Sequence, residues 1–175
     1  MTEQKAAELR HTVTRLTEIG ELEEAKEAIQ KLIELEGHSS FAYNKLGVIF
    51  ARSEDLGRAK TCFENALTIE PESAPALSNL GNVYRENGDL DGAIRLYKSA
   101  IEYDPDYATA YHNLGVVYRQ KGDFQKAVEH LKQGNKLQRV MARRELKGTS
   151  LGKRQPVFWV VLALAAAAFL YLFRR

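Results

Sequence analysis

The sequence predicts an all-α fold, a solenoid of about four helix-turn-helix pairs followed by one C-terminal transmembrane helix. Two observations predict it: an internal repeat with a period of 34 residues, and a segment of 18 residues near the C-terminus that carries no charge. A fixed period of this length is typical of stacked helix pairs, because each pair buries its apolar face only against its neighbours.

Three copies of the repeat follow one another in register, over residues 40–73, 74–107 and 108–141. The pattern occupies repeat positions 4, 7, 8, 11, 20, 24, 27 and 32. The residues there are Tyr43, Leu46, Gly47, Phe50, Ala59, Phe63, Ala66 and Pro71 in the first copy, Leu77, Leu80, Gly81, Tyr84, Ala93, Tyr97, Ala100 and Pro105 in the second, and Tyr111, Leu114, Gly115, Tyr118, Ala127, Leu131, Gly134 and Arg139 in the third. Glycine at position 8 and alanine at position 20 let two antiparallel helices approach, and the large residues fill the seam between them.

The ends of the helices are marked by turn residues. Gly88-Asp89 and Gly122-Asp123 suit the turn inside a pair, because glycine tolerates the left-handed conformation and aspartate caps the next helix. Glu54-Asp55 replaces this dipeptide in the first copy, so a less favourable turn is expected there. Pro71 and Pro105 end the second helices. Arg139 takes that place in the last copy, so its helix is expected to continue through Val140, Met141 and Leu146, and Gly134-Asn135 suits a polar end of the stack.

This constellation resembles the tetratricopeptide repeat family over residues 6–141. A divergent fourth copy at 6–39 keeps Leu9, Leu16, Ala25, Ile29 and Leu32 in phase but has Thr12-Val13 in place of Leu-Gly. The resemblance implies that the first helices line a concave groove that holds a peptide. The positions implied to bind it are Asn44, Lys45, Arg52, Ser78, Asn79, Asn82, Arg85, Glu86, Thr109, His112, Asn113, Arg119 and Gln120. Of the residues with which one subset of the family grips the carboxylate of a chaperone tail, only Asn79 is matched, so that ligand is not expected.

The uncharged segment, residues 156–173, predicts a transmembrane helix about 27 Å long. Trp159 and Tyr171 lie near its ends, and Lys153-Arg154 and Arg174-Arg175 flank it. A basic linker, 148–155, precedes it. The expected domains are thus a degenerate pair at 1–39, repeats at 40–73, 74–107 and 108–147, the linker and the span. The basic residues before the span predict that the repeats stay in the cytoplasm and that the chain is tail-anchored.

Composition narrows the function. The net charge is +2, but the last 34 residues carry seven basic side chains and one acidic one, Glu145. The rest of the chain is therefore acidic. An acidic surface disfavours a nucleic-acid partner. Cys62 is the single cysteine, so no disulfide and no cysteine-based zinc site is expected, and the residues before Arg15 predict no secretory signal. With no phosphate loop and no clustered histidines, the sequence predicts neither an enzyme nor a cofactor nor a metal site.

The sequence therefore favours a single-pass membrane scaffold that binds a partner protein or peptide. One alternative is a self-associating membrane protein, because Ala163 and Ala167 would let two transmembrane helices approach closely. Another is a tail-anchored adaptor of the organelle-fission type. A bacterial inner membrane is slightly favoured over a mitochondrial outer membrane, and the linker could also contact anionic lipid headgroups.

Overall fold

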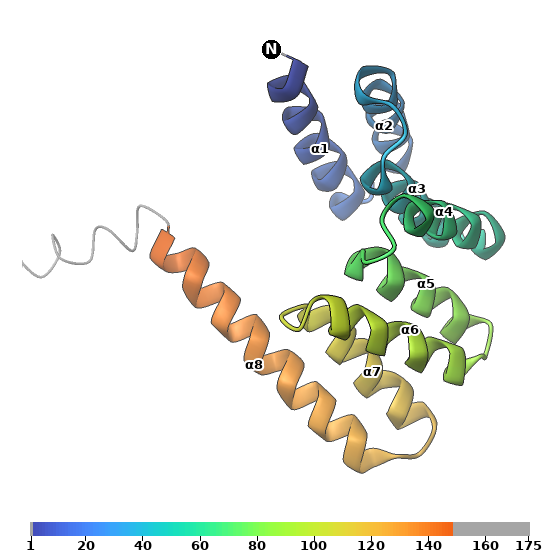
Figure 1. Ribbon diagram of the computed structural model, residues 1–175, viewed down its shortest axis with the longest axis vertical. Coiled ribbons are helices and arrows are strands. Elements are labelled where there is room, and N and C mark those ends of the chain that lie inside the picture. The colour runs from blue at the N-terminus through green and yellow to red at the C-terminus, as the bar shows by residue number, and fades with distance from the viewer. Residues whose placement is uncertain (1, 149–175) are drawn as a thin grey trace, which may run out of the picture. The chain divides into compact units, whose positions relative to one another are not determined.

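The computed structural model describes residues 2–148, and these form eight helices in four antiparallel pairs (Figure 1). The helices are α1 (Thr2–Ile19), α2 (Leu22–Glu36), α3 (Ser40–Arg52), α4 (Leu56–Ile69), α5 (Ala74–Glu86), α6 (Leu90–Tyr103), α7 (Ala108–Gln120) and α8 (Phe124–Gly148). The divergent copy at 6–39 is thus a helix pair, and the predicted all-α repeat stack is confirmed. The predicted transmembrane span lies outside the described residues, and none of the helices in residues 2–148 is long and apolar enough to cross a membrane.

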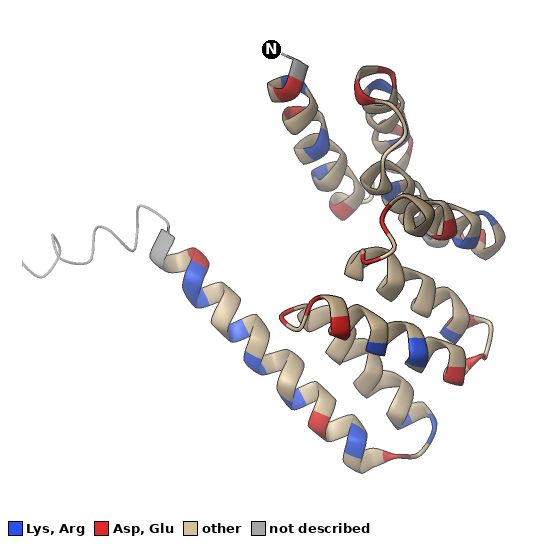
Figure 2. Cartoon of the chain, viewed as in Figure 1, with Lys and Arg blue, Asp and Glu red and all other residues tan. Residues whose placement is uncertain are grey.

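The chain divides into two compact units, residues 1–135 and residues 136–175, and the two differ in charge. Residues 1–135 carry 16 basic and 22 acidic side chains, whereas residues 136–175 carry nine basic side chains and one acidic. In Figure 2 the acidic residues are scattered over the helix pairs and their turns, and α8 is marked mainly by basic ones. The boundary falls inside α8, so the start of this helix belongs to the stack and the rest to the basic unit.

From α1 to α7 each helix contacts the next along the chain, and α7 packs against the start of α8 through Gly115 and Leu131. Consecutive first helices also contact one another: α1 touches α3, α3 touches α5, and α5 touches α7. The second helices α2, α4 and α6, all described throughout, make no such contacts among themselves. Because the first helices lie close together and the second helices are spread apart, the first helices form the inner face of a curved stack.

The seam inside each of the last three pairs depends on glycine at repeat position 8. A Cβ atom on Gly47 would lie 2.5 Å from Cε1 of Phe63, and one on Gly81 would lie 2.6 Å from Cε1 of Tyr97. One on Gly115 would lie 2.6 Å from Cγ of Leu131. Real Cβ contacts are not this short, so any larger residue would force the facing side chain or its helix to shift. The prediction that this glycine permits close packing is confirmed.

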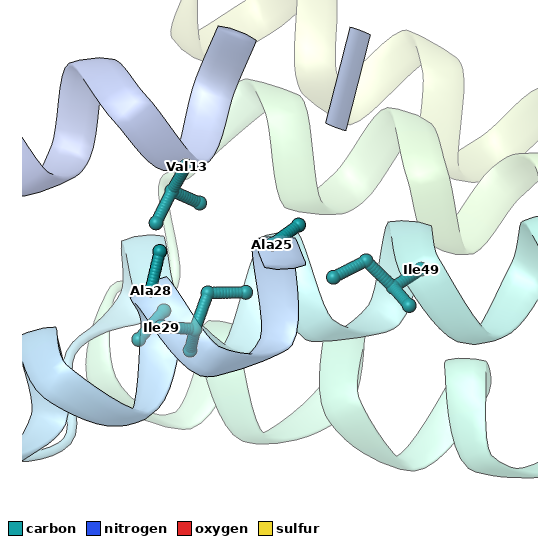
Figure 3. Close-up of a cluster of buried hydrophobic side chains, with 6 residues drawn as sticks. Val13, Ala25, Ala28, Ile29 and Ile49 are labelled. Atoms are coloured by element: carbon teal, nitrogen blue, oxygen red, sulfur yellow. The ribbon is translucent and has the colours of Figure 1, made fainter. Parts of the chain in front are cut away.

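The first pair fills the same seam differently. Val13 stands at the glycine position and is fully buried, and Ile29 takes the place of the aromatic residue with 1% of its surface exposed. Val13 and Ile29 belong to one cluster with Ala25, Ala28 and Ile49, which joins α1, α2 and α3 (Figure 3). A smaller residue on the second helix therefore makes room for a larger one on the first.

The turns follow the predicted chemistry. Gly88 and Gly122 have φ of +82° and +80°, and Asp89 Oδ1 accepts a hydrogen bond from the backbone N–H of Gly92 at 2.7 Å. At the corresponding turn of the second pair, Glu54 has φ +61°, the one positive φ at a non-glycine residue in residues 2–148. Residues with a Cβ atom disfavour this left-handed backbone conformation. The less favourable turn predicted at Glu54 is confirmed.

The last helix runs without interruption for 25 residues. Pro71 and Pro105 each follow a second helix by two residues, whereas α8 has no proline and includes Gly148, the residue at which the sequence predicts the linker to begin. Gly134 is buried because the ring of His112 lies over it: a Cβ there would be 2.8 Å from His112 Cδ2. This glycine therefore serves packing, and only its neighbour Asn135 is an exposed polar residue.

Candidate functional site

A groove of about 570 Å³ lies on the inner face, between α3 and α5. We call it the α3–α5 groove. Its apolar lining comes from α3, α4 and α5, and its polar lining comes mainly from the C-terminal halves of α3 and α5. The apolar residues are Val48, Ala51, Leu56, Phe63 and Val83, and the polar ones are Arg52, Glu54, Asn79, Asn82, Arg85 and Glu86. Five of the residues implied by the family resemblance therefore meet in one place.

Side-chain hydrogen bonds tie the first helices together beside this groove. Nδ2 of Asn79 donates to Oδ1 of Asn44 at 2.9 Å, which joins α5 to α3. Nδ2 of Asn113 donates to Oγ of the fully buried Ser78 at 3.1 Å, which joins α7 to α5. Both bonds run from position 6 of one repeat to position 5 of the repeat before it. Four residues implied to bind a peptide thus have partners inside the chain and hold the inner face in shape.

The side chain of Asn82 is held in place by two hydrogen bonds to its amide oxygen. Oδ1 accepts from the hydroxyl of Tyr97 at 2.7 Å and from Nδ2 of Asn113 at 3.0 Å. Because both lone pairs of an amide oxygen are then used, the orientation of the amide is set. Its Nδ2 donates to none of residues 2–148, so it remains available to a ligand in the groove. Burial raises the pKa of Tyr97 to about 12, so this hydroxyl remains a donor across the physiological pH range.

Arg85 supplies a second donor to the groove. Its Nη2 donates to Oε1 of Glu86 at 2.5 Å, while its Nε is buried and has no partner among the described residues. A buried donor without an acceptor costs about 1–3 kcal/mol, and a ligand in the groove recovers it only if the guanidinium turns Nε toward that ligand. Arg52, on the other side of the groove, donates from Nη1 to the backbone oxygen of Thr17 and so ties α3 to α1.

The remaining predicted residues lie elsewhere. Lys45 is half-buried with its ammonium 5.5 Å from the ring centre of Phe41, and burial lowers its pKa. His112 packs against α8, and its Nε2 is buried without a partner in the described part of the chain. Thr109, Arg119 and Gln120 are exposed on α7. None of these five lines the α3–α5 groove.

Sequence reasoning missed the apolar part of the groove. Val48 and Ala51 occupy repeat positions 9 and 12, where the later copies have Asn82 and Arg85, then Val116 and Arg119. A search for polar peptide-binding residues passes over them. The available signal was that only the copy at 40–73 is apolar at both positions.

Reactive groups are sparse in the described chain. Burial raises the pKa of the Cys62 thiol, although the nearby Arg58 acts in the opposite direction, so the thiol is protonated near neutral pH. Within residues 2–148, no group of three or more His, Cys, Asp or Glu side chains is placed to hold a metal ion. The α3–α5 groove is therefore the site with the clearest binding chemistry.

Four family models match the chain, and together they span residues 42–139. One described as "TPR repeat" matches residues 81–120, and three described as "Tetratricopeptide repeat" match residues 42–73, 62–95 and 108–139. No curated protein matches the chain.

Solved structures with a similar fold include two of MamA. One is 27% identical, with a TM-score of 0.61 over 79% of this chain and 81% of that one. The other is 28% identical, with a TM-score of 0.59 over 81% of this chain and 77% of that one. PilF of Pseudomonas aeruginosa is 22% identical, with a TM-score of 0.69 over 79% of this chain and 63% of that one, and this likeness concerns the fold alone.

Proposed function

We propose that this chain, which is built of tetratricopeptide repeats, is a membrane-anchored scaffold that holds an extended segment of a partner protein in the α3–α5 groove. The observation that carries the proposal is the combination found there: an apolar floor beside Asn82 Nδ2, a donor that no described residue uses, and the guanidinium of Arg85.

The groove suits one type of segment. An apolar side chain of the partner would be buried against Val48, Leu56 and Val83, which contributes about 1.5–3 kcal/mol. Backbone carbonyls or a carboxylate on either side of it would accept from Asn82 and Arg85. An extended peptide offers both groups, because alternate side chains point in opposite directions and its backbone carbonyls have no internal partners.

The groove is organised before any ligand arrives. The bonds from Asn79 to Asn44 and from Asn113 to Ser78 fix the spacing of α3, α5 and α7. A surface that is already ordered loses less conformational entropy when it binds. The internal partners of these asparagines therefore support binding even though the side chains are not themselves free.

Anchoring is the second part of the proposal. Residues 156–173 contain ten Val, Leu or Phe residues, which favour insertion by roughly 3–6 kcal/mol on the translocon scale. The basic residues that precede this segment favour a cytoplasmic repeat domain. Confinement to one membrane surface raises the effective concentration of any partner there. The proposed location is a bacterial inner membrane, with the mitochondrial outer membrane as the alternative.

The groove is tested with two matched arginine deletions in the same repeat. Arg85→Ala removes a donor from the groove, and Arg95→Ala removes an exposed arginine from α6. Proteins captured by the full chain from solubilised membranes are quantified by mass spectrometry. We expect Arg85→Ala to reduce one captured protein by about tenfold, as the loss of a charge-assisted hydrogen bond implies, and Arg95→Ala to leave it unchanged. Equal capture by both variants at matched thermal stability would refute the proposed groove.

The anchor is tested separately. A tagged full-length chain is expected to stay with membranes in alkaline carbonate, and fractionation identifies which membrane holds it. Release by carbonate would remove the anchor from the proposal without affecting the groove.

A further inference from the structure

Basic residues recur along the part of α8 from Lys136 onward (Figure 2). We call the set formed by Lys136, Arg139 and Arg143 the basic stripe. Lys136, Arg139 and Arg143 are exposed, and their spacing of three and then four residues places them on one side of the helix. From Lys136 to Arg143 the stripe is about 10 Å long.

Nothing in the described chain neutralises this stripe. Lys136, Arg139 and Arg143 form no ion pair with any carboxylate in residues 2–148. The one acidic residue nearby is Glu145, which lies about half a turn around the helix from Arg143. Three positive charges on one side of a helix repel one another unless an anionic surface binds them.

Apolar side chains accompany the stripe. Val140 and Leu146 lie on its two sides with 38% and 63% of their surfaces exposed. A helix that combines basic and exposed apolar residues is typical of the membrane interface, where cations reach headgroup phosphates and apolar side chains enter the acyl boundary.

The charge difference between the two units indicates which part of the chain would meet an anionic surface. Residues 1–135 are acidic and would be repelled by such a surface, whereas residues 136–175 are strongly basic. The stripe also ends at Arg143, thirteen residues before the proposed transmembrane segment, so that an anchored chain holds it close to the headgroups.

We propose that the stripe formed by Lys136, Arg139 and Arg143 is a binding surface for anionic phospholipid headgroups. The proposal rests on the proposed membrane anchoring for its cellular setting. The stripe brings α8 onto the membrane surface, and its occupancy depends on the anionic lipid content of that membrane.

The test uses the full chain in lipid nanodiscs, with Cys62→Ser and an environment-sensitive fluorophore on Val140→Cys. Discs of phosphatidylcholine alone are compared with discs that also contain phosphatidylserine. We expect a blue shift of the label only in the anionic discs, and its loss at high salt, because screening weakens headgroup attraction.

The variant pair Lys136→Gln/Arg139→Gln is compared with Arg95→Gln/Lys98→Gln, which removes the same two residue types at the same spacing from the exposed face of α6. The first pair is expected to reduce the ratio of surface-bound to free α8 by roughly thirtyfold, and the second to leave it unchanged. Equal shifts in both kinds of disc, or equal losses from both pairs, would overturn the proposal.

Two other outcomes can be told apart in this experiment: failure of the anchor and binding of nucleic acid by the stripe. If the chain enters neither kind of disc, the anchor fails, and the stripe is then judged by adding vesicles of the two compositions: a shift with phosphatidylserine vesicles alone supports it, and no shift overturns it. If the label responds to a single-stranded oligonucleotide and not to phosphatidylserine, the stripe binds nucleic acid and the lipid assignment is wrong.

Discussion

The first helix pair and the three pairs after it fill the same seam with opposite distributions of size. In the second pair Gly47 faces Phe63, whereas in the first pair Val13 and Ile29 stand at the equivalent positions. In both pairs the residues at these positions are buried. The comparison shows that the seam closes with either distribution of size, and that glycine is only one way to fill it.

The largest expected effect comes from putting the first pair's residue into the second pair. Gly47→Val should lower the free energy of unfolding by about 3 kcal/mol, the upper end of the overpacking range, because the new Cβ would lie 2.5 Å from a ring that is itself 1% exposed. Denaturant unfolding of the full chain in detergent measures it. A loss below about 1 kcal/mol would show that the seam is looser than the structure has it.

A second substitution, in the residue that faces Gly47, tests whether the two seam positions compensate for each other. Phe63→Ile alone should be destabilising through the cavity it leaves, but Gly47→Val together with Phe63→Ile should cost about 1–3 kcal/mol less than the sum of the two single changes. The measurement is a double-mutant cycle by denaturant unfolding. Strict additivity would mean that the Val13 and Ile29 pairing is a coincidence of the first repeat.

The repeat period and the small and large positions were enough to predict the seam, the helix pairs and the strained turn at Glu54, because each depends on residues within one repeat. The hydrogen bonds between first helices were not predicted. They depend on which side chains occupy position 5 of one repeat and position 6 of the next, and Asn79 reaches Asn44 only after the stack has formed.

The candidate site was predicted only in part, because part of its lining depends on contacts between helices. The sequence indicated polar residues of the inner face, and Asn79, Asn82 and Arg85 do line the α3–α5 groove. Its apolar floor was missed because Val48 and Ala51 are apolar where polar residues were expected, and because Leu56 and Phe63 come from α4, outside the first helices. The position of His112 depends on Gly134 of α8, which leaves room for its ring.

Tyr97 provides a comparison with Phe63 at the same repeat position. Tyr97→Phe should cost about 1 kcal/mol at neutral pH, because the hydrogen bond to Asn82 is lost. Burial raises the folded-state pKa of Tyr97 from 10.0 to about 12, so its contribution is complete below pH 10 and is lost as the pH rises toward 12. Unfolding measured across this range should show the wild type losing stability more steeply than the variant. Parallel pH profiles would contradict the burial of this hydroxyl.

The smallest expected change in the free energy of unfolding comes from a substitution in a turn. Glu54→Gly should raise the free energy of unfolding by about 0.5 kcal/mol, because relief of a left-handed side chain, about 1–2 kcal/mol, exceeds the extra chain entropy of glycine, about 0.5–1 kcal/mol. Gly88→Ala, at the equivalent turn with φ +82°, is the reciprocal control and should be destabilising. Thermal unfolding compares the two, and a lower stability for Glu54→Gly would show that Glu54 has a compensating contact.

The central claim, that the α3–α5 groove holds a partner, is tested most directly by photocrosslinking from the membrane-bound chain. A photoreactive residue at Ala51 lies in the groove and spares the hydrogen bonds of Asn82, and one at Lys98 lies on the exposed face of α6. We expect one dominant crosslinked protein from Ala51 that is absent from Lys98 and is reduced by Arg85→Ala. The same products from both positions, or a product from Lys98 alone, would contradict it.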